Sequence, residues 1–415
     1  MNLTAGFTQR QIIYGRTLNT AAHKPIQIRA IMRIIAVDTY LLESKLERPF
    51  GWSQGWIDRR SIGLVKIATD EGLVGWGEGC SGAAHAVVAD LAPLLVGEDP
   101  MQRNLLWQRM YGALHNANTG VGFGASAISA LDIALWDLAG KASGLPIHEL
   151  LGGRVRDRIA VYATGLYYTE GEFPDRLLNE ARGYVDAGYT GMKTKVGGLA
   201  VEEDVRRVAA IRAAIGPEVK LMVDANQCYN AATAIRIGRR LAEYDIFWFE
   251  EPVPTLDVDS CVQVKAALPM AIAGGEVLRT RYEYRNALLR NCFDIIQPDV
   301  GNVGGISEMR NVAMTANTFG VQVNPHVWGS SVMIAATLHV ASTLPPCPPA
   351  RSPQPYVQEP VMEFDRTPNA IRDELCDVVF NQQDSFVDVP MSPGLGVEVD
   401  ERALARLAVH SNRMS

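Results

Sequence analysis

The stretch Tyr189-Thr-Gly-Met-Lys-Thr-Lys-Val196 decides how this chain is interpreted. Lys193 and Lys195 are two residues apart, so on a β-strand their side chains point to the same face. Two ammonium groups held so close repel, and one tends to lose its proton unless an anion lies between them. A lysine with a lowered pKa can act as a base near neutral pH. Taken alone, the pair also fits a solvated edge strand, and residues further along the chain argue against that.

Acidic residues follow the next three predicted strands in a regular register. The strands Lys220–Asp224 and Phe247–Glu250 end on Asp224 and Glu250, and Met270–Gly274 is followed by Glu276. The spacings are equal (250 − 224 = 26 and 276 − 250 = 26), and one βα unit of a barrel has about that length. A single such acid would more simply be a helix cap or a surface residue. Three in register predict carboxylates that converge at one mouth from adjacent strands.

Strand and helix patterns alternate with about this repeat length from about residue 155 onward, which favours a parallel sheet. Eight strands that nearly all end in a polar residue favour a barrel, because barrel enzymes place their sites there. The other five expected strands are Ile159–Ala163, Gly191–Val196, Ile295–Pro298, Val321–Asn324 and Val361–Phe364.

The part of the chain before the barrel has a different pattern. We expect strands from 32 to about 80, with a Gly-, Trp- and Arg-rich loop, Glu47–Arg60, suited to closing over a ligand. A buried helix, Ala125–Lys141, follows. The predicted domains are an N-terminal extension over 1–31, an α+β domain over 32–150 that residues 366–415 complete, and the barrel over 151–365.

Composition limits the classes of function. The chain has 415 residues, 47% of them hydrophobic and 20% charged, as in a globular protein. A net charge of −7 without a basic run argues against nucleic acid as a partner. The sequence has no apolar stretch of about 18 residues, so it predicts no membrane-spanning helix. The six scattered cysteines, without a CxxC pair or a secretory signal before them, favour the cytoplasm.

Three convergent carboxylates need a cation, and ligation by oxygen alone suits a hard divalent ion such as Mg²⁺. Such an ion beside a lysine suggests removal of the proton α to a substrate carboxylate. Lys195, neutral beside Lys193 and the metal, would take that proton, and the charged Lys193 would bond a carboxylate oxygen. His326 approaches from the other side of the barrel, with Asp299 one strand earlier to orient it and raise its pKa. It would return a proton or protonate a leaving group.

These motifs together resemble the enolase superfamily, mandelate racemase subgroup, over about residues 32 to 400. The matching residues are Lys193-x-Lys195, Asp224-x-Asn226, Trp248-Phe-Glu-Glu-Pro252, Gly275-Glu276 and the Asp299–His326 pair. The resemblance implies an α+β capping domain on a modified TIM barrel, (β/α)7β, and the Lys or His base with Mg²⁺ known for that superfamily.

The resemblance also implies roles for individual residues. Asp224, Glu250 and Glu276 would be the metal ligands, and Lys195 and the His326–Asp299 dyad the two bases. Asn226 would support the metal or the substrate, and Glu363 would contact the substrate carboxylate or its intermediate. A homo-oligomer is the implied default.

Local stretches such as Pro325-His-Val-Trp-Gly329 are most similar to acid-sugar members, the dehydratases and galactarolactone cycloisomerases. Such an enzyme converts a sugar acid, or its lactone, to a 2-keto-3-deoxy acid by β-elimination. Racemisation or epimerisation of a 2-hydroxy acid is an alternative that the same residues allow. A non-catalytic metal-binding protein is a remote one. Another remote one is a serine hydrolase, because Gly51-Trp-Ser-Gln-Gly55 matches the G-x-S-x-G pattern.

Overall fold

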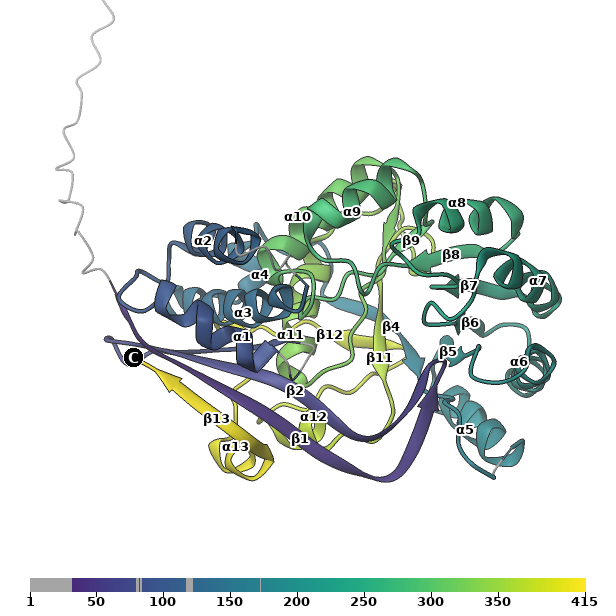
Figure 1. Ribbon diagram of the computed structural model, residues 1–415, viewed down its shortest axis with the longest axis horizontal. Helices are drawn as coiled ribbons and strands as arrows, with labels where there is room; N and C mark the ends of the chain where they lie inside the picture. Colours follow the sequence, from purple (N-terminus) through teal and green to yellow (C-terminus); the bar gives the residue numbers. More distant parts are fainter. Residues whose placement is uncertain (1–31, 80–81, 83, 117–121, 172) are drawn as a thin grey trace, which may run out of the picture. The chain divides into compact units, whose positions relative to one another are not determined.

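The computed structural model describes residues 32–79, 82, 84–116, 122–171 and 173–415 (Figure 1). Met32–Ser415 form one compact unit. The predicted N-terminal extension, residues 1–31, lies outside the described residues. Within the compact unit the strands form two sheets, one antiparallel and one mostly parallel.

The antiparallel sheet has the strand order β13-β1-β2-β3. Its strands are β1 (Ile34–Trp52), β2 (Gly55–Thr69), β3 (Val74–Gly79) and β13 (Ala408–Met414). β1 and β2 form one long hairpin, so the prediction of a loop over Glu47–Arg60 was wrong. Phe50 pairs with Ile57 and Trp52 with Gly55, which leaves a two-residue turn at its tip. Bulky aromatic and β-branched residues favour this cross-strand pairing, although glycines dilute the strand pattern in the sequence.

The helices between β3 and the barrel are α1 (Ala84–Leu91), η1 (Ala92–Leu94), α2 (Arg103–Asn116), α3 (Gly124–Ser143) and α4 (Ile147–Leu150). Helix α3, which the sequence predicts over Ala125–Lys141, is buried along almost its whole length. It packs against three alternating glycines of β3. A Cβ atom on Gly77 would lie 1.9 Å from the carbonyl oxygen of Ala130, so only glycine permits this approach of strand to helix.

The second sheet is the barrel. Its eight parallel strands are β4 (Arg158–Thr164), β5 (Gly191–Lys195), β6 (Lys220–Asp224), β7 (Ile246–Glu250), β8 (Ala271–Gly274), β9 (Ile295–Ile296), β10 (Gln322–Val323) and β11 (Val361–Asp365). The intervening helices are α5 (Asp175–Asp186), α6 (Val201–Ile215), α7 (Ala231–Leu241) with η2 (Ala242–Tyr244), α8 (Val258–Ala267), α9 (Thr280–Leu289), α10 (Gly305–Thr318) and α11 (Ser331–Thr343).

Neighbouring barrel strands follow sequence order from β4 to β10, and β11 returns beside β4. Between β10 and β11 the barrel closes through isolated hydrogen bonds instead of a regular strand ladder. One of them, of 3.0 Å, runs from the Glu363 amide to the Pro325 carbonyl. Eight strands with helices between them confirm the predicted (β/α)7β barrel with its capping domain. Carboxyl ends of all eight strands therefore meet at one mouth.

The residues after β11 contribute to both sheets. They form α12 (Ala370–Glu374), β12 (Phe386–Asp388), α13 (Glu401–Leu407) and β13. β12 pairs with β4 of the barrel, whereas β13 pairs with β1. The boundaries assigned to the two domains stay a prediction. Of the described helices, none combines the length and apolarity that a membrane crossing requires.

The tip of the β1–β2 hairpin reaches the mouth of the barrel (Figure 1). Gly51, near the tip, exchanges two backbone hydrogen bonds with Tyr168, which follows β4; they measure 2.8 and 2.9 Å. Ser53 and Gln54, the turn residues, bond to Asn226 after β6. The hairpin thus places side chains of the antiparallel sheet over the ends of the barrel strands.

Candidate active site

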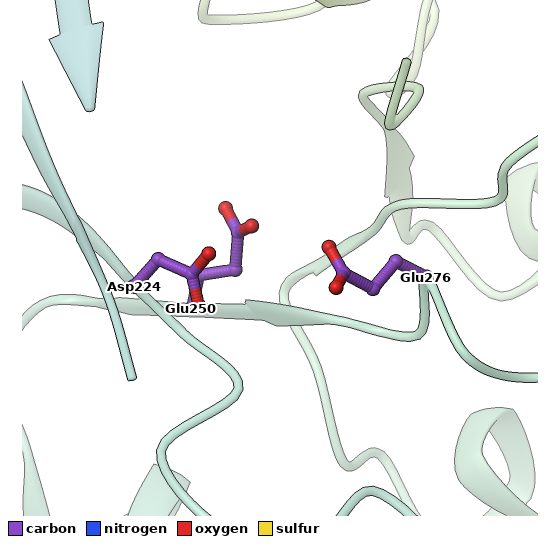
Figure 2. Close-up of side chains that lie close together, drawn as sticks. All are labelled: Asp224, Glu250 and Glu276. Atoms are coloured by element: carbon purple, nitrogen blue, oxygen red, sulfur yellow. The ribbon is translucent and has the colours of Figure 1, made fainter. Parts of the chain in front are cut away.

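The three predicted metal-binding carboxylates converge at the barrel mouth. Asp224 and Glu250 are the last residues of β6 and β7, and both are fully buried. Glu276 lies two residues beyond β8, after Gly275, whose φ of 106° favours glycine. Each of the three offers a ligand atom, and these atoms lie within 4.8 Å of one another. Figure 2 shows Glu276 facing the other two across the gap that a cation would fill. The set of oxygen donors fits a divalent metal ion.

Lys193 is buried beside three carboxylates. Its Nζ contacts Glu250, lies 3.0 Å from Glu363 Oε1 and lies 3.8 Å from Asp224 Oδ2. Burial disfavours its ammonium form, but these carboxylates outweigh burial and raise its pKa well above the usual value. Lys193 is therefore a fixed positive charge at the mouth.

Lys195 lies on the same face, as the strand period requires, and its Nζ donates to Asp224 Oδ2. Burial favours the neutral amine, but Asp224 outweighs it and the pKa is raised. The prediction of a neutral Lys195 refers to the metal-loaded site, where a cation ligated by Asp224 would compete with the lysine for that carboxylate. Asn226 donates to the same carboxylate through its backbone amide, at 2.8 Å, and its side chain, at 3.2 Å.

His326 and Asp299 form the expected dyad, with His326 Nδ1 2.5 Å from Asp299 Oδ2. The other ring nitrogen, Nε2, lies 3.4 Å from Glu276 Oε2 and 3.4 Å from Glu363 Oε2. Burial lowers the pKa of His326, but Glu276, Glu363 and Asp299 together raise it to about 10. Asp299 also accepts the Gly301 amide at 2.7 Å, which fixes its orientation. The dyad thus presents Nε2 to the cavity beside Glu276, whereas Lys195 contacts Asp224.

Glu363, the middle residue of β11, joins the two sides. Its Oε1 accepts Thr164 Oγ1 at 2.6 Å, in addition to the contact with Lys193. Burial raises its pKa, but Lys193 and then His326 outweigh this and lower it to about 2. All nine site residues predicted from the sequence therefore meet at one mouth, while the role of each stays a prediction.

The sequence analysis assigned no role to several residues that support the site. Glu250 Oε2 accepts Trp248 Nε1 at 2.9 Å and Gln297 Nε2 at 2.6 Å, which orients that carboxylate. Glu251 is buried behind it, and burial with the nearby Glu276 raises its pKa to about 8. Trp248 lies two residues before Glu250, and Gln297 lies two residues before Asp299. Because side chains two residues apart on a strand point to the same face, this period could have predicted that both residues face the site.

A cavity of about 260 Å³ opens onto these groups. Its polar lining consists of site residues already described: Lys195, Asn226, Glu276, His326 and Glu363. Its remaining lining is aromatic or aliphatic: Phe50, Trp52 and Ile57 from the hairpin, Tyr167 after β4 and Trp328 after β10. We call these five residues the apolar wall. Phe50 and Tyr167 hold each other in place, with ring centroids 4.6 Å apart.

Ser53 of the Gly51–Gly55 motif is not placed as a hydrolase nucleophile. It occupies the turn between two strands, and β2 rather than a helix follows it. Its hydroxyl is 3.1 Å from Asn226 Oδ1 and 3.3 Å from the Asp224 carbonyl. The strand–turn–helix that a nucleophile elbow requires is absent here, so the motif serves to fasten the hairpin to the barrel.

Comparison with known proteins agrees with this geometry. Residues 176–403 match the family described as "Enolase C-terminal domain-like". Residues 36–152 match "Mandelate racemase / muconate lactonizing enzyme, N-terminal domain". The chain belongs to the enolase superfamily. The predicted resemblance to its mandelate racemase subgroup is thus confirmed.

Individual superfamily members are similar over nearly their full length. The D-galactarolactone cycloisomerase of Agrobacterium fabrum is 41% identical, with 90% of this chain and 98% of that protein covered. The solved 3,6-anhydro-D-galactonate cycloisomerase of Zobellia galactanivorans is 36% identical, with a TM-score of 0.81, covering 91% of this chain and 100% of that one. A mutant L-talarate/galactarate dehydratase, liganded with Mg and L-glucarate, is 29% identical, with a TM-score of 0.80 and coverage of 99% and 98%.

Proposed function

We propose that this chain catalyses Mg²⁺-dependent removal of the proton α to the carboxylate of a sugar acid or sugar-acid lactone, followed by β-elimination to a 2-keto-3-deoxy acid. The observation that carries the proposal is that Lys195 contacts Asp224, whereas His326 Nε2 lies 3.4 Å from Glu276, which faces Asp224 and Glu250 across the candidate metal site (Figure 2). The names of the similar enzymes, cycloisomerases and a dehydratase, support the class of reaction.

The three carboxylates would hold the metal ion. Bound there, Mg²⁺ would offset the second negative charge that grows on the substrate carboxylate as its α-proton leaves. Lys193, which Glu250 and Glu363 keep charged, would donate a hydrogen bond to the same substrate carboxylate. Both contributions are largest at the transition state, because the charge they oppose develops there.

The two sides of the cavity would divide the proton transfers. Lys195 would take the α-proton, and the electron pair would form the double bond between the α- and β-carbons as the bond from the β-carbon to its oxygen breaks. His326 Nε2 would give a proton to the leaving oxygen, and Asp299 would hold the imidazole ring in the required orientation through its contact with Nδ1. Tautomerisation of the enol then yields the 2-keto acid.

The experiment is a screen of sugar acids and lactones with Mg²⁺ in D₂O, followed by NMR. A 2-keto-3-deoxy acid formed from the open acid identifies a dehydratase, and the same product from the lactone alone identifies a cycloisomerase. Deuterium entering the α-position without a new product would indicate a racemase or epimerase instead. If Mg²⁺ binds but no acid exchanges its α-proton, the proposal is refuted.

Two variants assign the bases. Lys195→Ala is expected to abolish both exchange and turnover. His326→Asn is expected to abolish turnover and to retain α-exchange, because Lys195 still faces the proton. Mg²⁺ affinity, measured by calorimetry, is the control that shows each variant still folds around the carboxylates. A homo-oligomer, a cytoplasmic location and the absence of a nucleic-acid partner stay predictions.

A further inference from the structure

Each member of the dyad precedes a barrel helix that begins against the capping domain. Asp299 lies eight residues (307 − 299 = 8) before Ser307, the third residue of α10. His326 lies four residues (330 − 326 = 4) before Ser330, the N-cap of α11. Helix α3 packs against α10, and strand β3 packs against α11. The capping domain therefore meets the barrel where the two dyad segments end.

Asp132 of α3 binds Ser307 through both of its carboxylate oxygens. Its Oδ2 accepts the Ser307 amide at 2.9 Å, and its Oδ1 accepts the Ser307 hydroxyl at 2.7 Å. The approach is close, because a Cβ atom on Gly305, whose φ is 86°, would lie 2.4 Å from Asp132 Oδ2. A carboxylate at this place also faces the positive end of the α10 dipole. Asp132 thus fixes the end of the segment that begins at Asp299.

Glu78 of β3 repeats this arrangement at α11. The Ser330 amide donates to Glu78 Oε1 at 3.0 Å and to Oε2 at 3.2 Å, and the Ser330 hydroxyl also donates to Oε2. A Cβ atom on Gly329 would lie 2.3 Å from Glu78 Oε1, so this approach is close as well. Glu78 thus fixes the end of the segment that begins at His326.

Both carboxylates are costly to bury, which argues for a directional role. Glu78 and Asp132 are fully buried, and burial raises the pKa of each to about 7. Hydrogen bonds from the serines oppose this rise without cancelling it. Apolar side chains of similar volume would fill the same space at a lower cost. A carboxylate on a serine, however, holds one position and one orientation, which apolar contact does not.

The segments that join the serines to the dyad are short and partly tied to the site. The Asn302 and Val303 amides donate to the Asp299 carbonyl at 3.0 and 2.8 Å. The Val327 amide lies 3.3 Å from Glu363 Oε2. A displaced serine therefore moves the dyad residue before it. Lys195, in contrast, belongs to β5, on another part of the barrel.

We infer that Glu78 and Asp132 are positioning residues for the His326–Asp299 dyad, each acting through its serine. For its catalytic consequence the inference rests on the proposed function. Proton donation from His326 to the leaving oxygen then depends on the capping domain, whereas removal of the α-proton by Lys195 does not. A misplacement of about 1 Å can slow a catalysed step by about a hundredfold.

The test compares turnover with α-deuterium exchange, in D₂O with Mg²⁺, on D-galactarolactone and D-galactonate. Glu78→Ala and Asp132→Ala are each expected to raise the ratio of exchange to turnover by about tenfold or more. Glu78→Gln and Asp132→Asn keep an oxygen for the serine amide and should restore most of the wild-type ratio. A loss of folded enzyme alone would lower both rates by the same factor and leave the ratio unchanged.

Asp137→Ala is the matched control, because Asp137 is a buried carboxylate on the same helix. It accepts the Trp76 and Leu395 amides, each at 2.9 Å, and pairs with Lys141 at 3.0 Å. None of these partners belongs to a dyad segment, so the ratio should equal that of the wild type.

Ser307→Ala and Ser330→Ala remove only the hydroxyl of each pair. They should raise the ratio in the same direction by a smaller factor, and they decide the question if the variants at Glu78 and Asp132 do not fold.

A second readout needs no substrate. The Nδ1 proton of His326, which lies in the contact with Asp299, should resonate far downfield in the proton NMR spectrum, and His326→Asn assigns the signal by removing it. The signal should move upfield or disappear in Glu78→Ala and Asp132→Ala and should persist in Asp137→Ala.

An unchanged signal in Glu78→Ala or Asp132→Ala would remove that residue from the inference, and an equal change in Asp137→Ala would overturn it altogether. An unchanged ratio would overturn the catalytic consequence. If no sugar acid exchanges its α-proton in the wild type, the proposed function fails, while the NMR signal still decides whether the two carboxylates position the dyad.

Discussion

A buried histidine pair predicts how the stability of this protein depends on pH. His148 of α4 and His339 of α11 are both fully buried, and their Nδ1 atoms are 3.1 Å apart. Arg154 donates to His148 Nε2 at 3.2 Å, and His339 Nε2 lies 3.1 Å from the Leu395 carbonyl. These partners require His148 to donate through Nδ1 and His339 to donate through Nε2. Each ring is then neutral, and a further proton would break a bond.

The magnitude follows from the pKa values. Burial lowers the pKa of His339 to about 3, whereas an unfolded histidine titrates near 6.5. Because the pKa of His339 is lower in the folded chain than in the unfolded chain, its contribution to the free energy of unfolding is complete above pH 6.5 and is lost as the pH falls below that value. At pH 5 the unfolded chain holds the extra proton and the folded chain does not. The free energy of unfolding should therefore fall by about 2 kcal/mol between pH 7.5 and pH 5 through this residue alone.

The assay is urea unfolding at both pH values, at one protein concentration, for the wild type and His339→Gln. Glutamine keeps a hydrogen-bond donor for the Leu395 carbonyl but cannot titrate. The free energy of unfolding of the variant should therefore fall by about 2 kcal/mol less than that of the wild type between the two pH values. His115→Gln, at an exposed position, is the matched control and should behave as the wild type. Equal losses in the wild type and His339→Gln would refute the reasoning.

Three further predictions concern the fold and the metal. Gly77→Ala should lower the free energy of unfolding by about 1–3 kcal/mol or more, since its Cβ would meet the Ala130 backbone. In the matched control Gly112→Ala in α2, the added Cβ meets nothing within 4 Å, so this variant should be neutral or stabilising. Thermal melts of the two variants and the wild type measure both effects. Arg60→Met removes the nearer of the two arginines that pair with the buried Asp365 carboxylate, while Arg372 remains 3.4 Å away. It should cost about 1–3 kcal/mol in urea unfolding, whereas Arg59→Met, on the exposed neighbour, should cost under about 1 kcal/mol. Mg²⁺ added to chelator-treated protein should raise the melting midpoint in proportion to RT ln(1 + [Mg²⁺]/Kd), and an equal concentration of K⁺ should not.

The barrel and its polar residues could be predicted because strand ends carry their own signal. Asp224 and Glu250 close short apolar strands, and a βα unit repeats at a nearly constant length, so their convergence follows from local patterns. The Lys193–Lys195 pair follows from the strand period alone. Each of these inferences needs only residues that are close in the sequence.

Features that depend on distant partners escaped prediction. β13 carries no apolar alternation of its own, since its strand residues are mostly exposed, and only its pairing with β1 makes it a strand. The apolar wall likewise combines Trp52 with Trp328, from sheets that no local pattern brings together. Ser53 was noticed through a motif, but its use depends on Asn226, which lies 173 positions further along the chain.

The pairing of β13 with β1 sets an order in which this protein can be built. Met414 lies opposite Val37, so 414 − 37 = 377 residues separate the two partners along the chain. At roughly 5–20 residues per second, a ribosome needs on the order of 20–75 s to deliver the last strand after the first. Throughout that interval the outer edge of β1 offers unpaired backbone groups to any other extended segment. β1 also carries Phe50 and Trp52, so a strand that lines the cavity is also the strand whose partner is synthesised last. Nascent chains on ribosomes that translate the same mRNA are therefore most prone to pair wrongly along this edge.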